Sequence, residues 1–236
     1  MSEICRYDFQ YDEMHQAGAD HADPGRARSY DELMERFRDY EAEAARVVDL
    51  LSIESGHAVL DLGAGTGALA LGIARRCRTL TAVDVSPAML MILREKADRA
   101  GLRNIETVTA GYLTFDAAGR KWDRIVSNVV LHHLPDFWKV VGLRRVHEML
   151  ADGGVFLLRD VVFSFEPDDY RAQMGGMLDM LAEQTGPELV DDGILHFREE
   201  YSTFDWILDR IIERTGFAIA DKTVASPTMV EYILTG

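Results

Sequence analysis

The sequence predicts an α/β fold, in which a doubly wound and largely parallel sheet is covered by helices on both faces. Short apolar runs alternate with helical stretches between residues 58 and 163, which is typical of parallel strands joined by right-handed crossovers. The first strand leads directly into a glycine-rich turn. Near the end, two strands around Pro227 have the short connection of an antiparallel hairpin. The 236 residues suffice for one such domain with an appendage.

Ahead of the sheet, apolar residues from about Tyr30 to Leu51 recur every three or four positions. This spacing predicts one amphipathic helix, for which Asp31 is a suitable N-cap. Residues 1–29 are polar and lack that periodicity. We therefore expect an N-terminal helical cap or lid at 1–52 and a ligand-binding domain at 53–236.

The strands of the sheet are short and apolar, and helices lie between them. We expect strands at 58–62, 80–84, 104–109, within 122–131 and at 154–163, and helices at 87–101 and 136–150. The first of these helices has the clearest ends. Ser86 is its expected N-cap, Pro87 suits the first turn, and Gly101 suits a left-handed stop.

Residues 164–215 exceed what a regular crossover needs, which indicates an insertion at the ligand edge of the sheet. We expect two helices in it, at 167–183 and 203–215, joined by a link rich in Gly, Pro and Asp. Its aromatic residues and methionines suit the wall of a pocket for an apolar small molecule. Strands at 217–224 and 229–235 close the chain.

Composition narrows the class of partner. The net charge is −15, and with no strongly basic face we expect neither a nucleic acid nor a membrane partner. The two cysteines give no disulfide framework and no Cys-based zinc site, and no apolar run approaches a membrane span. We expect a cytoplasmic enzyme that acts on a small molecule, holds no metal, and is a monomer or homodimer.

The glycine-rich turn, in the pattern Asp61-x-Gly63-x-Gly65-x-Gly67, suits close approach of a nucleotide-like ligand to the backbone. A dinucleotide fingerprint is also met if Ala68 takes the last position, with Asp84 about 20 residues on. Three features oppose that alternative: the acidic residue two places before the first glycine, the early third glycine, and the absence of a Tyr-x-x-x-Lys pair. The turn alone leaves both ligand classes open.

Five segments in order resemble class I S-adenosylmethionine (SAM) methyltransferases over nearly the full chain. They are Val59 to Gly67, Ala82 to Met89, Phe115 after the third strand, Trp122 to Asp136, and Leu150 to Leu158. The resemblance implies a three-layer, Rossmann-like α/β/α fold with seven strands in the order 3-2-1-4-5-7-6, the last strand antiparallel. It also implies SAM as cofactor and S-adenosylhomocysteine as product.

The resemblance implies roles for particular residues. Asp84 would accept hydrogen bonds from the ribose hydroxyls, Val85 and Met89 would pack on the adenine, and Asn128 would line the cleft. Relatives usually carry Gly-Asp where this chain has Ala110-Gly111, so adenine recognition should rest on backbone groups there. The cofactor-binding positions that we expect are Asp61, Gly63, Ala64, Gly65, Asp84, Val85, Met89, Gly111, Tyr112, Asn128, Tyr11, Tyr30 and Tyr40.

Candidates for a general base are His132, His133 and Asp160, all at carboxyl ends of strands. The histidines could instead cap a turn, and Asp160 could pair with Arg159. Tyr11, Tyr30 and Tyr40 could each cover the cofactor, donate a hydrogen bond to its carboxylate, or pack in a core or an interface. We expect in-line, metal-free methyl transfer to a small molecule. The alternatives are a SAM-binding protein without catalysis and a nicotinamide-dependent oxidoreductase.

Overall fold

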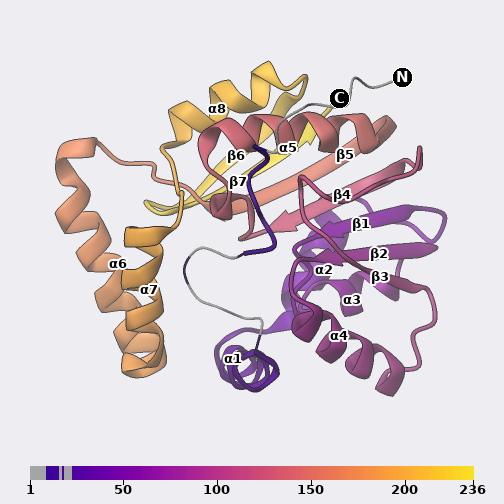
Figure 1. Cartoon of the computed structure of the whole chain (residues 1–236), viewed down its shortest axis with the longest axis horizontal. Helices are drawn as coiled ribbons and strands as arrows, with labels where there is room; N and C mark the ends of the chain where they lie inside the picture. The colour runs from indigo at the N-terminus through magenta and orange to yellow at the C-terminus, as the bar shows by residue number, and fades with distance from the viewer. Residues whose placement is uncertain (1–8, 16–17, 19–22) are drawn as a thin grey trace.

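The computed structural model describes residues 9–15, 18 and 23–236, and it contains the expected seven-stranded sheet with helices on both faces (Figure 1). The strands are β1 (Ala58–Leu62), β2 (Thr79–Asp84), β3 (Ile105–Thr109), β4 (Trp122–Asn128), β5 (Leu150–Val161), β6 (Ala218–Ser226) and β7 (Met229–Thr235). The helices are α1 (Pro24–Phe37), α2 (Tyr40–Leu50), α3 (Ala70–Ala74), α4 (Pro87–Arg99), α5 (Asp136–Met149), α6 (Tyr170–Thr185), α7 (Val190–Glu199) and α8 (Asp205–Arg214), with 3-10 turns η1 (Leu131–His133), η2 (Pro167–Asp169) and η3 (Gly186–Leu189).

The strand order is β3-β2-β1-β4-β5-β7-β6, as the resemblance implied. The first five strands of that order are parallel, while β7 runs antiparallel to both β5 and β6. Parallel strands end at the same edge, so the segments that follow β1, β2 and β4 meet there. Ligands of such sheets bind at this carboxyl edge, where the strand order reverses between β1 and β4.

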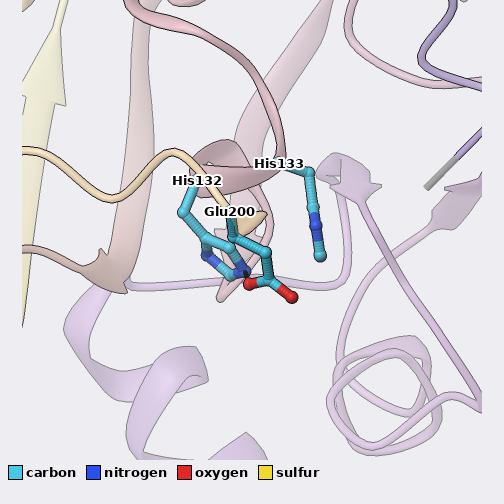
Figure 2. Close-up of side chains that lie close together, drawn as sticks. All are labelled: His132, His133 and Glu200. Carbon is cyan, nitrogen blue, oxygen red and sulfur yellow. Dashed lines mark ion pairs between the residues drawn. The ribbon is translucent and has the colours of Figure 1, made fainter. Parts of the chain in front are cut away.

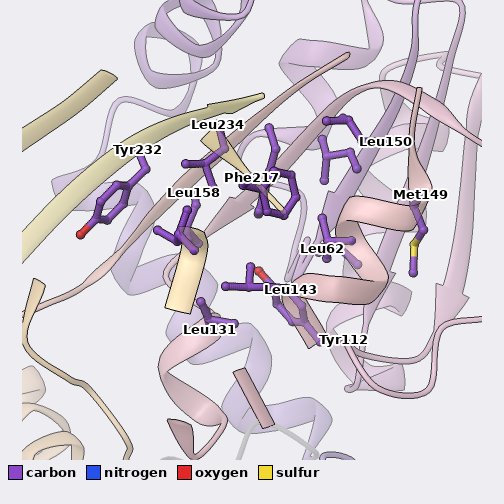
Figure 3. Packing of buried hydrophobic residues seen from close by; sticks show 14 of the residues in the cluster. Leu62, Tyr112, Leu131, Leu143, Met149, Leu150, Leu158, Phe217, Tyr232 and Leu234 are labelled. Atoms are coloured by element: carbon purple, nitrogen blue, oxygen red, sulfur yellow. The ribbon is translucent and has the colours of Figure 1, made fainter. Parts of the chain in front are cut away.

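One face of the sheet is covered by α5 and α8. Their apolar residues, such as Leu143 and Ile212, pack with Phe156 and Tyr232 of the sheet, and all four are fully buried. Figure 3 shows this packing, in which Tyr112 from the segment after β3 takes part. The segment that follows β3 is therefore fixed by the core.

The opposite face is covered by α2, α3 and α4. Val47, Ile73 and Leu93 pack there against Val59 of β1 and Leu80 of β2. These two strands are buried on both faces, which explains why they read in the sequence as largely apolar runs. As expected, α4 begins with Ser86, whose Oγ accepts a hydrogen bond from the backbone N–H of Met89, and its end is followed by Gly101 at φ 71°.

The prediction of one helix from Tyr30 to Leu51 is wrong, because the structure has two. The backbone is extended at Arg38, and the side chain of Asp39 then caps α2 by accepting from the N–H of Ala42. Asp31 is not an N-cap either, since α1 begins about two turns earlier with Asp23 as its cap. The apolar spacing continues across the break, so periodicity alone could not reveal it.

The insertion contains one more helix than predicted, α7, in the stretch expected to be a link. Gly186 at φ 71° does end α6, but Gly193 lies inside α7 and packs close to Leu178 and Leu181. This glycine serves helix–helix contact rather than a loop. In Figure 1 the α6–α7 pair stands at one side of the sheet. Among the described helices, none is long and apolar enough to span a membrane.

Candidate functional site

The glycine-rich turn follows β1 and is folded back onto β2. The N–H groups of Gly63 and Ala64 both donate to the carbonyl of Val83. Gly63 has φ 78°, and a Cβ there would lie 2.1 Å from Cγ2 of Val130, so only glycine fits. The turn therefore leaves open backbone at the carboxyl edge of the sheet.

Two carboxylates lie beside this turn. Asp84 accepts from the backbone N–H groups of Gly65 and Ser86, each at 2.8 Å. Burial nevertheless raises the pKa of Asp84, and burial together with the charge of Asp84 raises the pKa of Asp61 to about 7. Each oxygen of Asp84 retains a lone pair for a further donor such as a ligand hydroxyl.

Helix α1 is attached to the same turn by Asp31. Its carboxylate accepts from Oγ1 of Thr66 at 2.5 Å and pairs with Nζ of Lys96 in α4 at 2.6 Å. Asp31 and Thr66 are both buried. The residue that we expected to start a helix thus holds the glycine-rich turn in place from outside the sheet.

A cavity of about 430 Å³ opens over the carboxyl edge and contains most of the predicted site. Its walls come from the N-terminal segment, the glycine-rich turn, the ends of β2 and β4, and helices α6 and α7. The predicted site residues that line it are Tyr11, Tyr40, Asp61, Gly63, Ala64, Gly65, Asp84, Val85, Met89, Gly111, Tyr112, Asn128, His132 and His133. Asp160 lies behind His132, and the side chain of Tyr30 is outside the described residues.

Glu13 fills the position where Gly111 has no side chain. A Cβ at Gly111 would lie 2.5 Å from the carboxylate of Glu13. Oε1 of Glu13 accepts from the N–H groups of Leu113 and Thr114 and from Oγ1 of Thr114, at 2.7–2.8 Å. The N–H of Gly111 itself donates to Thr114 Oγ1. A carboxylate therefore lies beside Gly111 in the cavity wall, although the chain has no Asp at that position. It comes from a residue about a hundred positions earlier in the chain.

Burial outweighs those hydrogen bonds and raises the pKa of Glu13. The same N-terminal segment reaches the insertion, because the ring of Tyr11 packs edge-on against Tyr201 with centroids 6.2 Å apart. Burial and the contact with Tyr201 raise the pKa of Tyr11 to about 12. In Figure 1 this indigo segment crosses the middle of the molecule, between the sheet and the α6–α7 pair.

The three residues predicted as possible bases belong to one polar cluster. Nδ1 of His132 lies 2.5 Å from Oδ1 of Asp160, and its Nε2 lies 3.1 Å from Oε2 of Glu200. Glu200 also pairs with Nδ1 of His196. The side chains of His132, Asp160 and Glu200 are all less than a tenth exposed. Figure 2 shows Glu200 beside the His132 ring, with His133 on the other side.

The charges of this cluster are strongly coupled. Burial alone would lower the pKa of His132, but Asp160 and Glu200 raise it to about 9. Burial would raise the pKa values of both carboxyls, but the imidazoles lower them. Burial and the charge on His132 lower the pKa of His133 to about 4, so that ring is neutral. The Nδ1 of His133 is buried and has no hydrogen-bond partner among the described residues.

The sequence placed His196 in the insertion expected to shape the pocket, but it did not identify Glu13 or Glu200 as site residues. Each reaches the site through a contact between distant parts of the chain, and no local pattern marks such contacts. Helix α7 was itself missed, so the positions of His196 in its last turn and of Glu200 just after its end could not be used. The charge and aromatic content of residues 9–15 was visible but did not single out Glu13.

The comparisons with known proteins agree with this geometry. Residues 59–154 match the family model described as a methyltransferase domain. An uncharacterized methyltransferase of Bacillus licheniformis is 31% identical over 174 residues, covering 69% of this chain and 78% of that protein. The aklanonic acid methyltransferase of a Streptomyces species is 28% identical, covering 68% of this chain and 75% of that protein.

The fold has solved counterparts. A SAM-dependent methyltransferase from Clostridium acetobutylicum superimposes with a TM-score of 0.66 at 14% identity, covering 89% of this chain and 97% of that one. Three observations point to the same family. They are the sheet order, the glycine-rich turn that lines an open cavity, and the sequence match over most of both chains. The chain belongs to the class I SAM-dependent methyltransferases.

Proposed function

We propose that this protein binds SAM in the cavity and transfers its methyl group in line to a small-molecule acceptor. The observation that carries the proposal is Asp84, a buried carboxylate that lines the cavity at the end of β2, hydrogen-bonded to the backbone N–H of Gly65. In that position it suits the ribose hydroxyls, with the methionine part against Gly63 to Gly65 and the adenine between Met89 and Gly111.

The methyl group needs little further activation, because the sulfonium already makes it electrophilic. The protein must align the acceptor with the S–CH3 bond and keep water out. We assign the acceptor to the other half of the cavity, where His132 and His133 face the insertion. Both histidines line this half of the cavity, and Asp160 orients His132. The acidic chain favours a small acceptor over a nucleic acid, and we propose a cytoplasmic location.

The first test is calorimetric titration of the purified protein with SAM, S-adenosylhomocysteine and NADH. Asp84→Ala should weaken SAM binding by ~1–3 kcal/mol, the range for losing hydrogen bonds to a charged group. Asp98→Ala is the matched control, since Asp98 pairs only at the surface with Arg103. Unchanged SAM affinity in Asp84→Ala would show that the ribose assignment is wrong.

Turnover separates an enzyme from a binding protein without catalysis. With SAM carrying a labelled methyl group, quinols, phenols and small organic acids should be screened for label uptake. Transfer to any of them supports the enzyme, whereas tight SAM binding without transfer favours the binding protein. NADH binding in place of SAM would favour the oxidoreductase alternative, which the family membership opposes.

A further inference from the structure

We propose that His132, His133 and Glu200 form a binding site for a divalent first-row transition-metal ion. One ligand atom from each of these residues can be chosen so that all three lie within 4.8 Å of one another (Figure 2). We expected no metal from the sequence, in which these residues are far apart: the histidines follow β4, whereas Glu200 follows α7. The fold brings the two segments together, and the N–H of Tyr201 donates to the carbonyl of His132 at 2.8 Å.

The spacing suits an ion with nitrogen and oxygen ligands. In a tetrahedral site with bonds of about 2.1 Å, ligand atoms are about 3.4 Å apart. Nε2 of His132 and Oε2 of Glu200 are already 3.1 Å apart. The third ligand atom lies within 4.8 Å of the other two, and ligation would draw it closer by rotation of its side chain. Two imidazoles and one carboxylate are donors that Zn²⁺, Mn²⁺ and Co²⁺ accept.

The groups around the proposed ligands are those that support metal sites. The carboxylate of Asp160 holds Nδ1 of His132, which leaves Nε2 directed at Glu200. Such a carboxylate behind a ligating histidine fixes the ring and strengthens it as a ligand. His196 contacts Glu200 in the same way, and its own Nε2 lies 2.9 Å from Oγ of Ser202.

His133 is an independent indication that something else binds here. Its ring lies 4.3 Å from that of His132, and its buried Nδ1 has no partner among the described residues. Buried polar atoms are nearly always hydrogen-bonded, so an orphan in a cavity needs an explanation. A metal ion, or a water held by that ion, would satisfy this atom.

The charges also balance around a divalent ion. Asp160 and Glu200 contribute two buried negative charges to the cluster, which an ion of charge +2 would neutralise with all imidazoles neutral. On binding, the ion takes the place of the Nε2 proton of His132, and that proton leaves to solvent. The competing arrangement is an ion-pair network without metal, and the experiment below distinguishes the two.

The position of the site defines a class of acceptor, an inference that rests on the proposed function. The histidines follow β4, two strands across the sheet from Asp84 at the end of β2, so the ion would act on the acceptor and not on the methyl group. A bound divalent ion holds a hydroxyl or carboxyl oxygen and lowers its pKa. The acceptor would therefore be an oxygen nucleophile, such as a phenol, an enol or an acid.

The test is metal binding by the full-length chain without an affinity tag, after chelator treatment and dialysis. Calorimetric titration with Zn²⁺, Mn²⁺ and Co²⁺ should show one equivalent bound. Co²⁺ should also give visible absorption bands of histidine and carboxylate ligation. His133→Ala and Glu200→Gln should each weaken binding by more than about 10–100-fold, which is the loss typical of removing a residue that only supports a ligand. His57→Gln, which changes a histidine just before β1, should not.

Absence of stoichiometric binding by the wild-type chain would overturn the metal site in favour of the ion-pair network, and so would binding that both variants retain. S-adenosylhomocysteine titrations of the same samples confirm that each variant is folded. They also keep the two proposals separate. If the wild-type chain binds S-adenosylhomocysteine but no metal, only the metal site is rejected. If the wild-type chain does not bind S-adenosylhomocysteine, the proposed function is rejected.

Discussion

Glu13 is the residue whose role in the cavity is least expected from its place in the chain. It comes from the N-terminal segment, yet its carboxylate replaces a side chain that Gly111 lacks. Its Oε1 accepts hydrogen bonds from the turn after β3, and its Oε2 lies beside Gly111, in the part of the cavity assigned to the adenine. We infer that it accepts the adenine amine, a role that the sequence alone had left to backbone groups.

This inference predicts a specific rescue. Glu13→Ala should weaken SAM binding by about 1–2 kcal/mol, since it removes an acceptor from a partly buried site. Adding Gly111→Asp to that variant should restore much of the affinity, because it returns a carboxylate to the space that Glu13 vacates. In the wild-type background Gly111→Asp should instead be harmful, since the two carboxylates would collide. Calorimetry on all three variants checks this, and additive effects would contradict it.

Asp61 predicts a pH dependence of stability. Its pKa is about 7 in the folded protein and near 4 when unfolded, so folding takes up a proton between these values. Stability from this group is therefore greatest at low pH and falls as the pH rises through 4–7. Asp61→Asn should raise the unfolding free energy at pH 8 by up to about 4 kcal/mol, with little change near pH 4. Denaturant unfolding at both pH values measures this, and equal effects at the two would refute it.

At the scale of elements, α1 is part of the site through one buried side chain. Asp31 connects Thr66 of the glycine-rich turn to Lys96 of α4. The same two helices also share an exposed pair, Arg28 with Glu95, at 2.8 Å. A buried and an exposed ion pair between the same helices offer a matched comparison.

Asp31→Ala should lower the unfolding free energy by about 1–3 kcal/mol, because it leaves Lys96 and Thr66 short of a buried acceptor. It should also weaken SAM binding, since the glycine-rich turn loses its outer support. Glu95→Ala should change stability by less than about 1 kcal/mol and leave SAM binding unaltered. Urea unfolding and calorimetry on both variants provide the comparison; similar losses in the two would show that the buried pair has no special role.

At the scale of the whole molecule, the cavity is closed by segments far apart in the chain. Residues 9–15 contact both the turn after β3 and Tyr201, and Glu200 pairs with His132. Ligand binding should therefore slow hydrogen exchange in residues 9–15, 63–67, 111–114 and 190–200 together. The β6–β7 hairpin should not change and serves as internal reference. Protection confined to 63–67 would show that the other segments do not close over the ligand.

Ligand binding should also appear as thermal stabilisation of the folded state. At a concentration one hundred times its dissociation constant, S-adenosylhomocysteine adds about 2.7 kcal/mol to the folded state. For a chain of this size that corresponds to a rise in Tm of about 5–10 °C. Differential scanning calorimetry with and without ligand measures the rise.

The resemblance carried by five motifs in order implied the strand order that the structure has, and most of the residues expected at the cofactor line one cavity. Gly63 and Asp84 lie in a turn and at a strand end, where spacing along the chain fixes position in space. The break at Arg38, helix α7 and the contacts of Glu13 and Glu200 were missed. Each depends on packing between segments that approach only after folding, and apolar periodicity carries no information on which segments meet.

The two ends of the α6–α7 insertion lie side by side. Phe163, just after β5, forms a β-bridge with Phe204, and its N–H donates to the carbonyl of Thr203. The segment between Phe163 and Phe204, about forty residues long, begins and ends at neighbouring positions. It could therefore be replaced in evolution without changing the strand order of the sheet. Related chains could thus change acceptors by replacing the α6–α7 insertion while the cofactor half of the cavity stays the same. Chimaeras with junctions at Phe163 and Phe204 would transfer acceptor specificity from one chain to another.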